Sequence, residues 1–511
     1  MPKRNCARPQ AQKPDTIALQ AKFKRGLARH QKGKLADAER IYGEVLHLQP
    51  NHFGALHLLG VIALQTRRTE RGVELIRKAI GLNAKVAAAH SNLGNALKDL
   101  KRSEEALASY DKAIALRPDF AEAYCNRGNA LTDLMRPADA LASYDKALAL
   151  KPNYAEAYFN RGNVLRDLKR PEDALANYDR AIELKPSFAE AYNNRGNALR
   201  DLKRPEDALA SYDEAIALKP DYAQAYNNRG NALKDLKRPA DALASCDKAI
   251  ALKPDLANVW VSRAESLIAL KRVQESIIAY RQALKLGGDF ELIRYSLAAL
   301  GDEPPPIASP TRYIADLFDS YADDFDRELI ENLKYRTPTL LGNAIKRIVS
   351  SNTLDILDLG CGTGLTGVCL RPLGRTLTGV DLSTNMLNKA RQREIYDHLI
   401  CSELINFLQT QDKSFDLAVA ADVFVYIGDL AVVFQEVRRV LRDNGFFCFS
   451  VEGTDESKFV LRSTRRYAHS IDYLQKLAGQ YRFVVNTIEP QIIRQQSGEN
   501  VNGYHAIMRC C

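Results

Sequence analysis

Residues 354–364 read LDILDLGCGTG, in which an apolar run ends at Asp358 and glycines follow at positions 360, 362 and 364. A short apolar run before a glycine-rich turn is typical of a buried parallel strand, and residues 365–370 can then open a helix. Glycine permits positive φ and close approach of a ligand to the backbone. The stretch therefore predicts an α/β domain with a ligand site at the carboxyl end of its first strand.

Two kinds of nucleotide-like ligand fit such a turn. Gly362, Gly364 and Gly367 satisfy G-x-G-x-x-G, the pattern of nicotinamide dinucleotide sites. The carboxylate of Asp358 would repel a pyrophosphate, however, and would attract the ammonium and sulfonium groups of S-adenosylmethionine. A second apolar strand ends at Asp381, which is placed to accept hydrogen bonds from the ribose hydroxyls of either ligand. The charge at Asp358 favours S-adenosylmethionine.

Residues 311–511 resemble the class I S-adenosylmethionine-dependent methyltransferases over five segments in the family's order. The resemblance implies a doubly wound, Rossmann-like α/β domain with a seven-stranded sheet. Tyr321 lies in a segment that reaches the methionine end of the cofactor in this family, and it is included on that basis. The other residues predicted to bind the cofactor are Asp358, Gly360, Cys361, Gly362, Gly364, Asp381, Leu382, Met386, Ser402, Glu403, Leu404, Ala421 and Asp422.

The reaction that this resemblance implies is transfer of a methyl group from the sulfonium to a nucleophile. Because the cofactor carries the activated group, the protein mainly aligns the donor and acceptor and excludes water. His398, Tyr426 and His469 are possible bases, but no motif fixes any of them, so no catalytic residue is assigned.

A cluster of basic and aromatic residues falls where the family inserts substrate-facing helices. It offers a site for an anionic substrate, and a solvated helix face is the alternative. The cluster consists of Arg462, Arg465, Arg466, Tyr467 and His469.

The N-terminal part of the chain has a 34-residue period. Glycine recurs at positions 26, 60, 94, 128, 162, 196 and 230, Ala264 continues the series, and alanine, tyrosine and proline recur at fixed distances after it. The pattern resembles eight tetratricopeptide repeats, which implies an all-α superhelix. Small residues let two helices approach, the tyrosine fills the gap and the proline ends the second helix.

Five of these units carry two asparagines three residues apart, which places both side chains on one side of a helix. Asparagine offers a donor and an acceptor, so a ladder of them can hold an extended peptide without reading its sequence. The alternative is that the amides bond within the array or to water. The predicted groove residues are Asn92, Asn95, Asn126, Asn129, Asn160, Asn163, Asn194, Asn197, Asn228 and Asn231.

Composition divides the chain into a basic, disordered leader (1–15), the repeat array (16–300), a proline-rich linker (301–310) and the methyltransferase domain (311–511). The net charge of +9 comes from the array, but its aromatic residues occupy packing positions, so nucleic-acid binding is not favoured. Nine cysteines without metal-ligand spacing and no long apolar run predict a cytoplasmic protein with no metal site and no membrane span.

Three functions fit this organisation. The first is an active methyltransferase for an unidentified acceptor, with a small molecule favoured and the array docking a protein or peptide partner. The second is a protein methyltransferase whose asparagine groove holds the substrate chain. In the third, the array is a scaffold and the second domain only senses S-adenosylmethionine.

Overall fold

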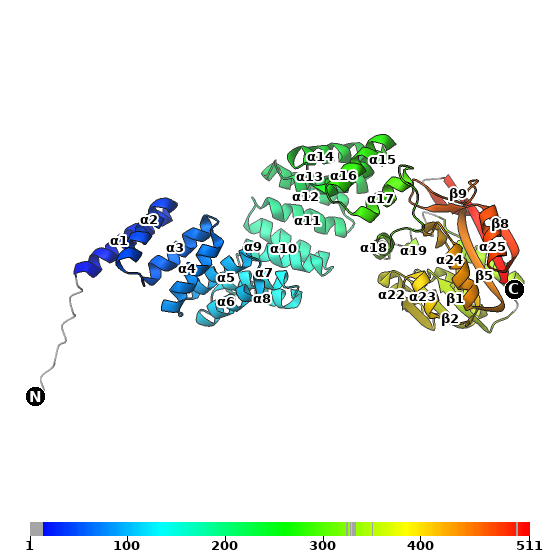
Figure 1. Cartoon of the computed structure of the whole chain (residues 1–511), viewed down its shortest axis with the longest axis horizontal. Helices are drawn as coiled ribbons and strands as arrows, with labels where there is room; N and C mark the ends of the chain where they lie inside the picture. Colours follow the sequence, from blue (N-terminus) through cyan, green and yellow to red (C-terminus); the bar gives the residue numbers. More distant parts are fainter. Residues whose placement is uncertain (1–13, 323–324, 328, 330–333, 350, 497–498) are drawn as a thin grey trace, which may run out of the picture. The chain divides into compact units, whose positions relative to one another are not determined.

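A computed structural model describes residues 14–322, 325–327, 329, 334–349, 351–496 and 499–511 (Figure 1). The chain divides into two compact units, Met1–Pro254 and Asp255–Cys511. Residues 1–13 of the predicted leader lie outside the described residues, and the first helix begins at Pro14.

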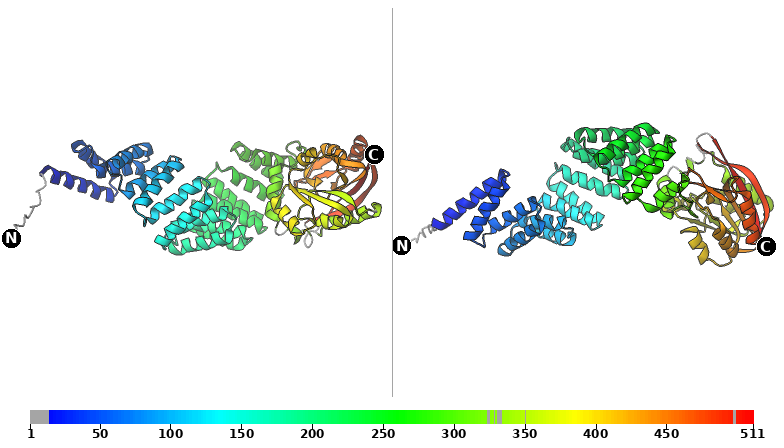
Figure 2. Two further views of the ribbon diagram at one scale, coloured as in Figure 1. Left: turned by 90° about the horizontal axis from the view of Figure 1, so that it is seen from below. Right: turned by 45° about the horizontal axis from the view of Figure 1, so that its top comes forward.

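The first unit consists of helix pairs that follow one another in chain order, as both views in Figure 2 show. The predicted tetratricopeptide repeats are confirmed. In most units a helix of 13 residues is followed by a helix of 14 residues. The helices are α1 Pro14–Gln31, α2 Leu35–Leu48, α3 Phe53–Gln65, α4 Thr69–Leu82, α5 Ala87–Asp99, α6 Ser103–Leu116, α7 Ala121–Asp133, α8 Pro137–Leu150, α9 Ala155–Asp167, α10 Pro171–Leu184, α11 Ala189–Asp201, α12 Pro205–Leu218, α13 Ala223–Asp235 and α14 Pro239–Leu252.

Packing within a pair follows the repeated residues. A Cβ at Gly94 would lie 2.5 Å from the ring of Tyr110, so glycine is what lets the two helices approach this closely. Ala106 and Tyr110 are fully buried. The turn between the helices has a left-handed backbone at a non-glycine residue, as at Lys101 with φ 61°, which costs about 1 kcal/mol.

The second unit contains the last helix pair of the array, α15 Ala257–Ala269 and α16 Val273–Lys285, and one further helix, α17 Phe290–Ala299. An α/β domain follows. Its helices are α18 Thr311–Tyr321, α19 Phe325–Arg327, α20 Thr337–Ile348, α21 Leu365–Leu370, α22 Thr384–Gln392, α23 Leu404–Thr410, α24 Ala431–Val440 and α25 Ile471–Gln480, with 3-10 turns η2 Arg371–Leu373 and η3 Phe424–Tyr426. Its strands are β1 Leu354–Leu359, β2 Gly374–Asp381, β3 His398–Cys401, β4 Phe415–Ala420, β5 Leu441–Gly453, β6 Phe459–Leu461, β7 Tyr467–His469, β8 Phe483–Gln496 and β9 Glu499–Cys510.

The sheet confirms the predicted doubly wound fold. Strands β3, β2, β1, β4 and β5 are parallel, β9 runs antiparallel beside β5, and β8 pairs with β9. These seven strands match the expected sheet, and the short hairpin β6–β7 adds two more at the carboxyl end of β5.

Alternate residues of the central strands enter two separate cores. Leu357 and Leu359 of β1 pack with α23, α24 and α25, whereas Ile356 packs with α20 and α21 on the other face. Because both faces are covered, the central strands are apolar throughout, as the sequence indicates. In such a sheet a ligand site is expected at the carboxyl ends of β1 and β4.

The last helix pair packs against the β6–β7 hairpin inside the second unit. The Tyr295 hydroxyl of α17 donates to the carbonyl oxygen of Arg465 at 2.6 Å, and Arg465 Nη2 donates to the Tyr280 hydroxyl of α16 at 2.9 Å. Glu265 of α15 lies 3.9 Å from the same guanidinium. The compact unit therefore begins before the predicted methyltransferase border, and the borders at 300 and 310 stay a prediction.

The proline-rich segment 301–310 is held at both of its ends. Asp302 forms an ion pair with Arg281 of α16 at 2.7 Å. Near the other end, the amides of Gly428 and Asp429 donate to Ile307 O at 2.8 and 3.0 Å, and Ser309 N donates to Tyr426 O at 2.9 Å. This segment is thus part of the fold of the second unit, although its prolines predicted a spacer.

Candidate active site

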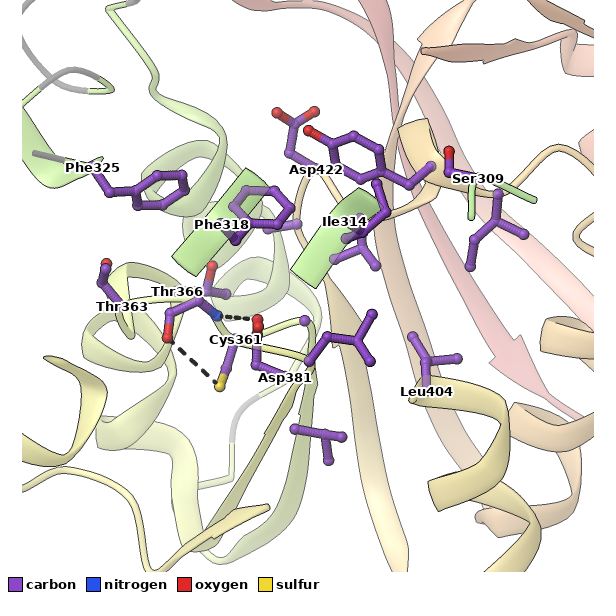
Figure 3. A pocket seen from close by; sticks show the side chains of 18 of the residues that line it. Ser309, Ile314, Phe318, Phe325, Cys361, Thr363, Thr366, Asp381, Leu404 and Asp422 are labelled. Atoms are coloured by element: carbon purple, nitrogen blue, oxygen red, sulfur yellow. Dashed lines mark hydrogen bonds between the residues drawn. The ribbon is translucent and has the colours of Figure 1, made fainter. Parts of the chain in front are cut away.

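A cavity of about 200 Å³ lies at the carboxyl ends of β1, β2 and β4. This is where the strand order reverses between β1 and β4, the usual ligand position in doubly wound sheets. Figure 3 shows Cys361, Thr363 and Asp381 below Phe318 and Ile314 of α18. Most of the predicted cofactor residues line it: Gly360, Cys361, Gly362, Asp381, Leu382, Ser402, Glu403, Leu404, Ala421 and Asp422.

The glycine loop has the left-handed backbone that its sequence predicts. The φ angles are 65° at Gly360, 54° at Gly362 and 91° at Gly364. A Cβ at Gly360 would lie 2.5 Å from Val423 Cγ2, whereas a Cβ at Gly362 would meet nothing closer than 3.8 Å. The loop therefore needs glycine at 360 for packing as well as for φ, and at 362 it presents bare backbone to the cavity.

Asp358 lies beneath the loop and is not among the residues that line the cavity. Its side chain is buried, and Oδ2 accepts a hydrogen bond from the Tyr396 hydroxyl at 2.6 Å. Oδ1 has no hydrogen-bond partner among the described residues. Burial raises the pKa of Asp358 to about 7, so the negative charge that favours a cationic cofactor is only partly present at neutral pH.

Asp381 lies at the end of β2 and faces the cavity (Figure 3). Its two carboxylate oxygens accept hydrogen bonds from Gly362 N at 2.8 Å and from Ser383 N at 2.9 Å. Burial raises the pKa of this group above its ordinary value. Each oxygen keeps a further lone pair, so the carboxylate can still accept hydrogen bonds from a ribose.

The predicted adenine side lies at the carboxyl ends of β2 and β3. Leu382, Ser402 and Leu404 line the cavity, and Glu403 also accepts a hydrogen bond from Asn406 N at 2.7 Å at the start of α23. Met386 is fully buried and does not line the cavity. Its predicted contact with the cofactor stays a prediction, because the position fits a core methionine equally well.

Helix α18 and the residues after it cover the cavity, as the resemblance implied for this segment. Ile314, Phe318 and Phe325 line it, and Asp319 accepts a hydrogen bond from the Ser383 hydroxyl, which ties α18 to the start of α22. Tyr321 is 46% exposed and is not a lining residue. Its predicted cofactor contact therefore stays a prediction.

Asp422 belongs to a charged network that the sequence did not reveal. Its carboxylate lies 3.2 Å from Arg494 Nη1, and Arg494 also pairs with Glu452 of β5. Arg494 and Glu452 are almost completely buried. Both occupy strand positions where apolar residues are expected, and a charged residue on an inward-facing strand position is the signal that would have found them.

The basic cluster lies on a strand hairpin, not on helices. β6 and β7 flank a turn at Arg465, which has φ 60°, and the only helix of this region is α25. The prediction of helices over residues 455–480 holds only for Ile471–Gln480. Over the hairpin it was wrong because FVL and YAH are short runs of branched and aromatic residues, which favour paired strands.

The three possible bases occupy different environments. Tyr426 lines the cavity. His469 is fully buried, and its Nε2 donates to the carbonyls of Ile427 and Gly428 at 3.0 Å. Burial lowers the pKa of His469 to about 4. His398 lies exposed on β3 and, like His469, is not a lining residue. Only Tyr426 can meet a substrate in the cavity.

The asparagines of the array bond to one another and to the repeated tyrosines. Asn163 Oδ1 accepts hydrogen bonds from the Tyr178 hydroxyl and from Asn194 Nδ2, both at 2.8 Å. The same arrangement recurs at Asn95 and Asn129. The ladder therefore links successive repeats, and its predicted role as a peptide groove stays a prediction.

A second ladder was not predicted. In four successive repeats an arginine joins an aspartate of the preceding helix to a side chain on the next helix. Arg127, for example, donates to Asp111 and to Ser143, both at 2.7 Å. The series continues at Arg161, Arg195 and Arg229. The invariant 34-residue spacing of these arginines was the signal.

No helix among the described residues is long and apolar enough to cross a membrane. No group of three or more His, Cys, Asp or Glu side chains in the described ranges is placed to hold a metal ion.

The chain is similar to known families in both of its parts. Residues 357–449 match a family described as a methyltransferase domain. Residues 94–134 match a TPR repeat family, and residues 23–87, 125–189, 159–223, 193–257 and 227–289 match a tetratricopeptide repeat family.

Curated relatives match the second part. A malonyl-acyl-carrier protein O-methyltransferase of Yersinia pestis is 29% identical over 147 residues, which cover 29% of this chain and 52% of the relative. The corresponding protein of Geobacter sulfurreducens is 34% identical over 23% of this chain and 45% of its own length. A ubiquinone biosynthesis O-methyltransferase of Hydrogenovibrio crunogenus is 26% identical over 23% of this chain and 50% of its own length. This chain thus spans about half the length of the curated relatives it matches.

The two family matches fall in the two parts that the sequence and the fold separate. The first consists of helix pairs with a 34-residue period, and the second has a doubly wound sheet with a glycine loop after its first strand. The chain therefore joins an N-terminal array of tetratricopeptide repeats to a class I methyltransferase domain.

Proposed function

We propose that this protein transfers a methyl group from S-adenosylmethionine to a small-molecule acceptor. The observation that carries the proposal is the cavity at the carboxyl ends of β1, β2 and β4, where a left-handed glycine loop lies between the buried carboxyl group of Asp358 and the half-buried one of Asp381. The relatives that share this part of the chain are named as O-methyltransferases. Substrate identity does not transfer from them, because the matches span about half of their length.

The residues of the cavity fit this cofactor. Asp381 keeps free lone pairs for ribose hydroxyls, the backbone at Gly362 is uncovered, and the unpartnered Oδ1 of Asp358 places a titratable group under the loop. Leu382 and Leu404 supply apolar walls beside Ser402 and Glu403. When bound, S-adenosylmethionine supplies an activated methyl group for displacement by a nucleophile.

The side chains of this chain then have three tasks. Phe318, Phe325 and Ile314 cover the cavity and exclude water, which strengthens every electrostatic interaction inside it. Asp381 orients the nucleoside part of the cofactor. Tyr426 is the one candidate base that faces the acceptor, but burial raises the pKa of its hydroxyl, so it favours orienting an acceptor that is already ionised over removing a proton.

We further propose that the repeat array docks a protein or peptide partner. A polar cavity of about 480 Å³ in the first unit is lined by three of the predicted groove asparagines, Asn194, Asn197 and Asn228. Asn193 and the charged side chains of Arg166, Arg200 and Asp201 also line it. The ladder amides keep spare donors after their bonds within the array. The cysteines of the described residues are free thiols, which supports the predicted cytoplasmic location.

The test is transfer of labelled methyl from S-adenosylmethionine into native cell extract by the full-length protein, with small molecules and proteins counted separately. Asp381→Asn keeps the shape of the side chain but replaces one acceptor oxygen by an NH2 donor, which cannot accept the hydrogen bond of Gly362 N. We expect this change to abolish transfer. Asp412→Asn, at an exposed carboxylate, is the matched control. Label in small molecules supports the proposal, label in protein supports the second hypothesis, and absence of label above Asp381→Asn would leave the sensor hypothesis.

A further inference from the structure

Among the described residues that line the cavity, Arg466 is the one that carries a positive charge. Its Nη1 atom is buried and has no hydrogen-bond partner among the described residues. Among the described residues, its ion-pair partner is Glu452, whose Oε1 lies 3.9 Å away, beyond hydrogen-bond range. A buried guanidinium nitrogen without a hydrogen-bond partner costs free energy, so Arg466 favours binding of an anionic group in the cavity.

The acidic groups around Arg466 are already engaged by other arginines. Glu452 Oε1 pairs with Arg494 Nη2, and Glu452 Oε2 accepts a hydrogen bond from Arg462 Nη1 at 3.0 Å. Asp422 lies 3.2 Å from Arg494. Among the described residues, two carboxylates thus face three guanidinium groups, and the unbalanced positive charge is the one that borders the cavity.

The acids of the cofactor side do not compensate this charge. Asp381 is engaged by the backbone of the glycine loop and of Ser383. Two lining residues act on the Arg466 guanidinium: Tyr426, whose ring centroid lies 6.0 Å from the guanidinium carbon, and Asp422, whose carboxylate is already paired with Arg494.

The adjacent arginine does not share this role. Arg465 Nη2 donates to Tyr280 at 2.9 Å, and Arg465 is not a lining residue. Neighbouring side chains of the hairpin turn thus point to different places, Arg465 to the last helix pair and Arg466 to the cavity. The tyrosine contacts of Arg465 fix the backbone of the turn and so hold Arg466 in position.

We infer that Arg466 binds an anionic group, a carboxylate or a phosphate, of the methyl acceptor. This inference rests on the proposed methyl transfer for the identity of its ligand, but the anion site itself is defined by the cavity. A guanidinium matches both groups because it offers parallel donors to two oxygens. The acceptor is therefore an acid or a phosphorylated compound, not a neutral or cationic molecule.

The anion site can be tested without turnover. The full-length protein saturated with S-adenosylhomocysteine is melted in sodium malonate or sodium phosphate, and in sodium chloride of equal ionic strength. We expect either anion to raise the melting temperature more than chloride does in the wild type, Arg466→Gln to lose that difference and Arg466→Lys to keep part of it. Arg509→Gln, which removes an exposed charge of β9, should behave as the wild type. Equal stabilisation of wild type and Arg466→Gln overturns the inference.

Turnover identifies the source of the anion. Small molecules of the extract are separated on an anion-exchange resin, and each fraction is offered to the protein with labelled S-adenosylmethionine. We expect label only from the retained fraction, and an approximately tenfold or larger rise in KM for Arg466→Gln with cofactor affinity unchanged. Loss of acceptor activity after phosphatase treatment assigns a phosphate, and its persistence assigns a carboxylate. Label from the unretained fraction overturns the inference.

The two proposals fail in different ways. A wild-type protein that labels nothing, yet shows stabilisation by malonate or phosphate that depends on Arg466, keeps the anion site and contradicts the proposed function. A wild-type protein that labels a neutral acceptor keeps the proposed function and contradicts the anion site.

Discussion

Replacing Tyr295 by phenylalanine tests how α17, the helix after the last helix pair, is joined to the methyltransferase domain. The Tyr295 side chain is 1% exposed, and its hydroxyl donates to the Arg465 carbonyl at 2.6 Å and lies 2.7 Å from the Ser309 hydroxyl. Tyr295→Phe keeps the ring and its packing against Tyr313 and Tyr467. It removes only the oxygen that joins α17, the 301–310 segment and the hairpin turn.

The expected loss of stability follows from the groups that this change leaves behind. The Arg465 carbonyl loses its donor in a buried place, which costs about 1–3 kcal/mol. Ser309 can rotate its hydroxyl to another acceptor, so its share is small. We therefore expect the free energy of unfolding of the second unit to fall by about 1–3 kcal/mol.

The chain offers a built-in probe for this measurement. Its single tryptophan, Trp260, lies in α15 of the second unit. Urea unfolding of the full-length protein followed by Trp260 fluorescence should show a lower midpoint for Tyr295→Phe. Tyr481→Phe, at a partly exposed ring of the same unit, should stay within about 0.5 kcal/mol of the wild type. Equal midpoints for the wild type and Tyr295→Phe would refute the proposed junction.

Three other changes have defined outcomes. The pKa of Asp358 is raised to about 7, so its contribution to stability is fully present below about pH 4 and is lost as pH rises through about 7. Asp358→Asn should therefore remove this pH dependence from the midpoint of unfolding. The same change should weaken cofactor binding, measured by calorimetry, most above pH 7. Gly360→Ala places a Cβ 2.5 Å from Val423 at φ 65°, and should lower cofactor affinity at least about tenfold in the same titration, with partial recovery in Gly360→Ala/Val423→Ala. Asn163→Ala removes the acceptor of two hydrogen bonds and should destabilise the array by about 1–2 kcal/mol in circular dichroism melts, whereas Asn163→Asp keeps the acceptor and should not; equal losses for both would mean that the ladder does not link the repeats.

The repeats and the sheet were predictable because both follow from local patterns. The 34-residue period fixes where Gly94 and Tyr110 meet, and the apolar run before Asp358 fixes a strand and a turn. The place of Asp381 was predictable for the same reason, since it ends the next strand and parallel strands end at one edge of a sheet.

What the sequence did not reveal depends on contacts between distant segments. Glu452 and Arg494 lie 42 residues apart and pair only because β5 and β8 flank β9. Burial raises the pKa of Asp358, and the burial of a side chain depends on the folded structure, so its charge at neutral pH could not be read from residue type. The helix prediction for the hairpin came from family resemblance, and the local strand pattern prevailed.

The junction at Tyr280 suggests how such a chain can change in length. In the central repeats the equivalent tyrosine, such as Tyr178, donates to an asparagine, and the next repeat supplies a second donor to that same amide. In the last repeat Glu265 stands at the asparagine position, and Arg465 of the hairpin takes the place of the next repeat.

The final unit is therefore specialised, whereas the central units that carry Asn95, Asn129 and Asn163 share one set of contacts. Duplication or deletion of a whole 34-residue unit among them would leave the contacts of Arg465 and the cavity unchanged. The number of repeats can drift over evolution while the enzyme part stays the same, so related chains with the same last unit should differ in repeat number more than in the sequence around Arg466.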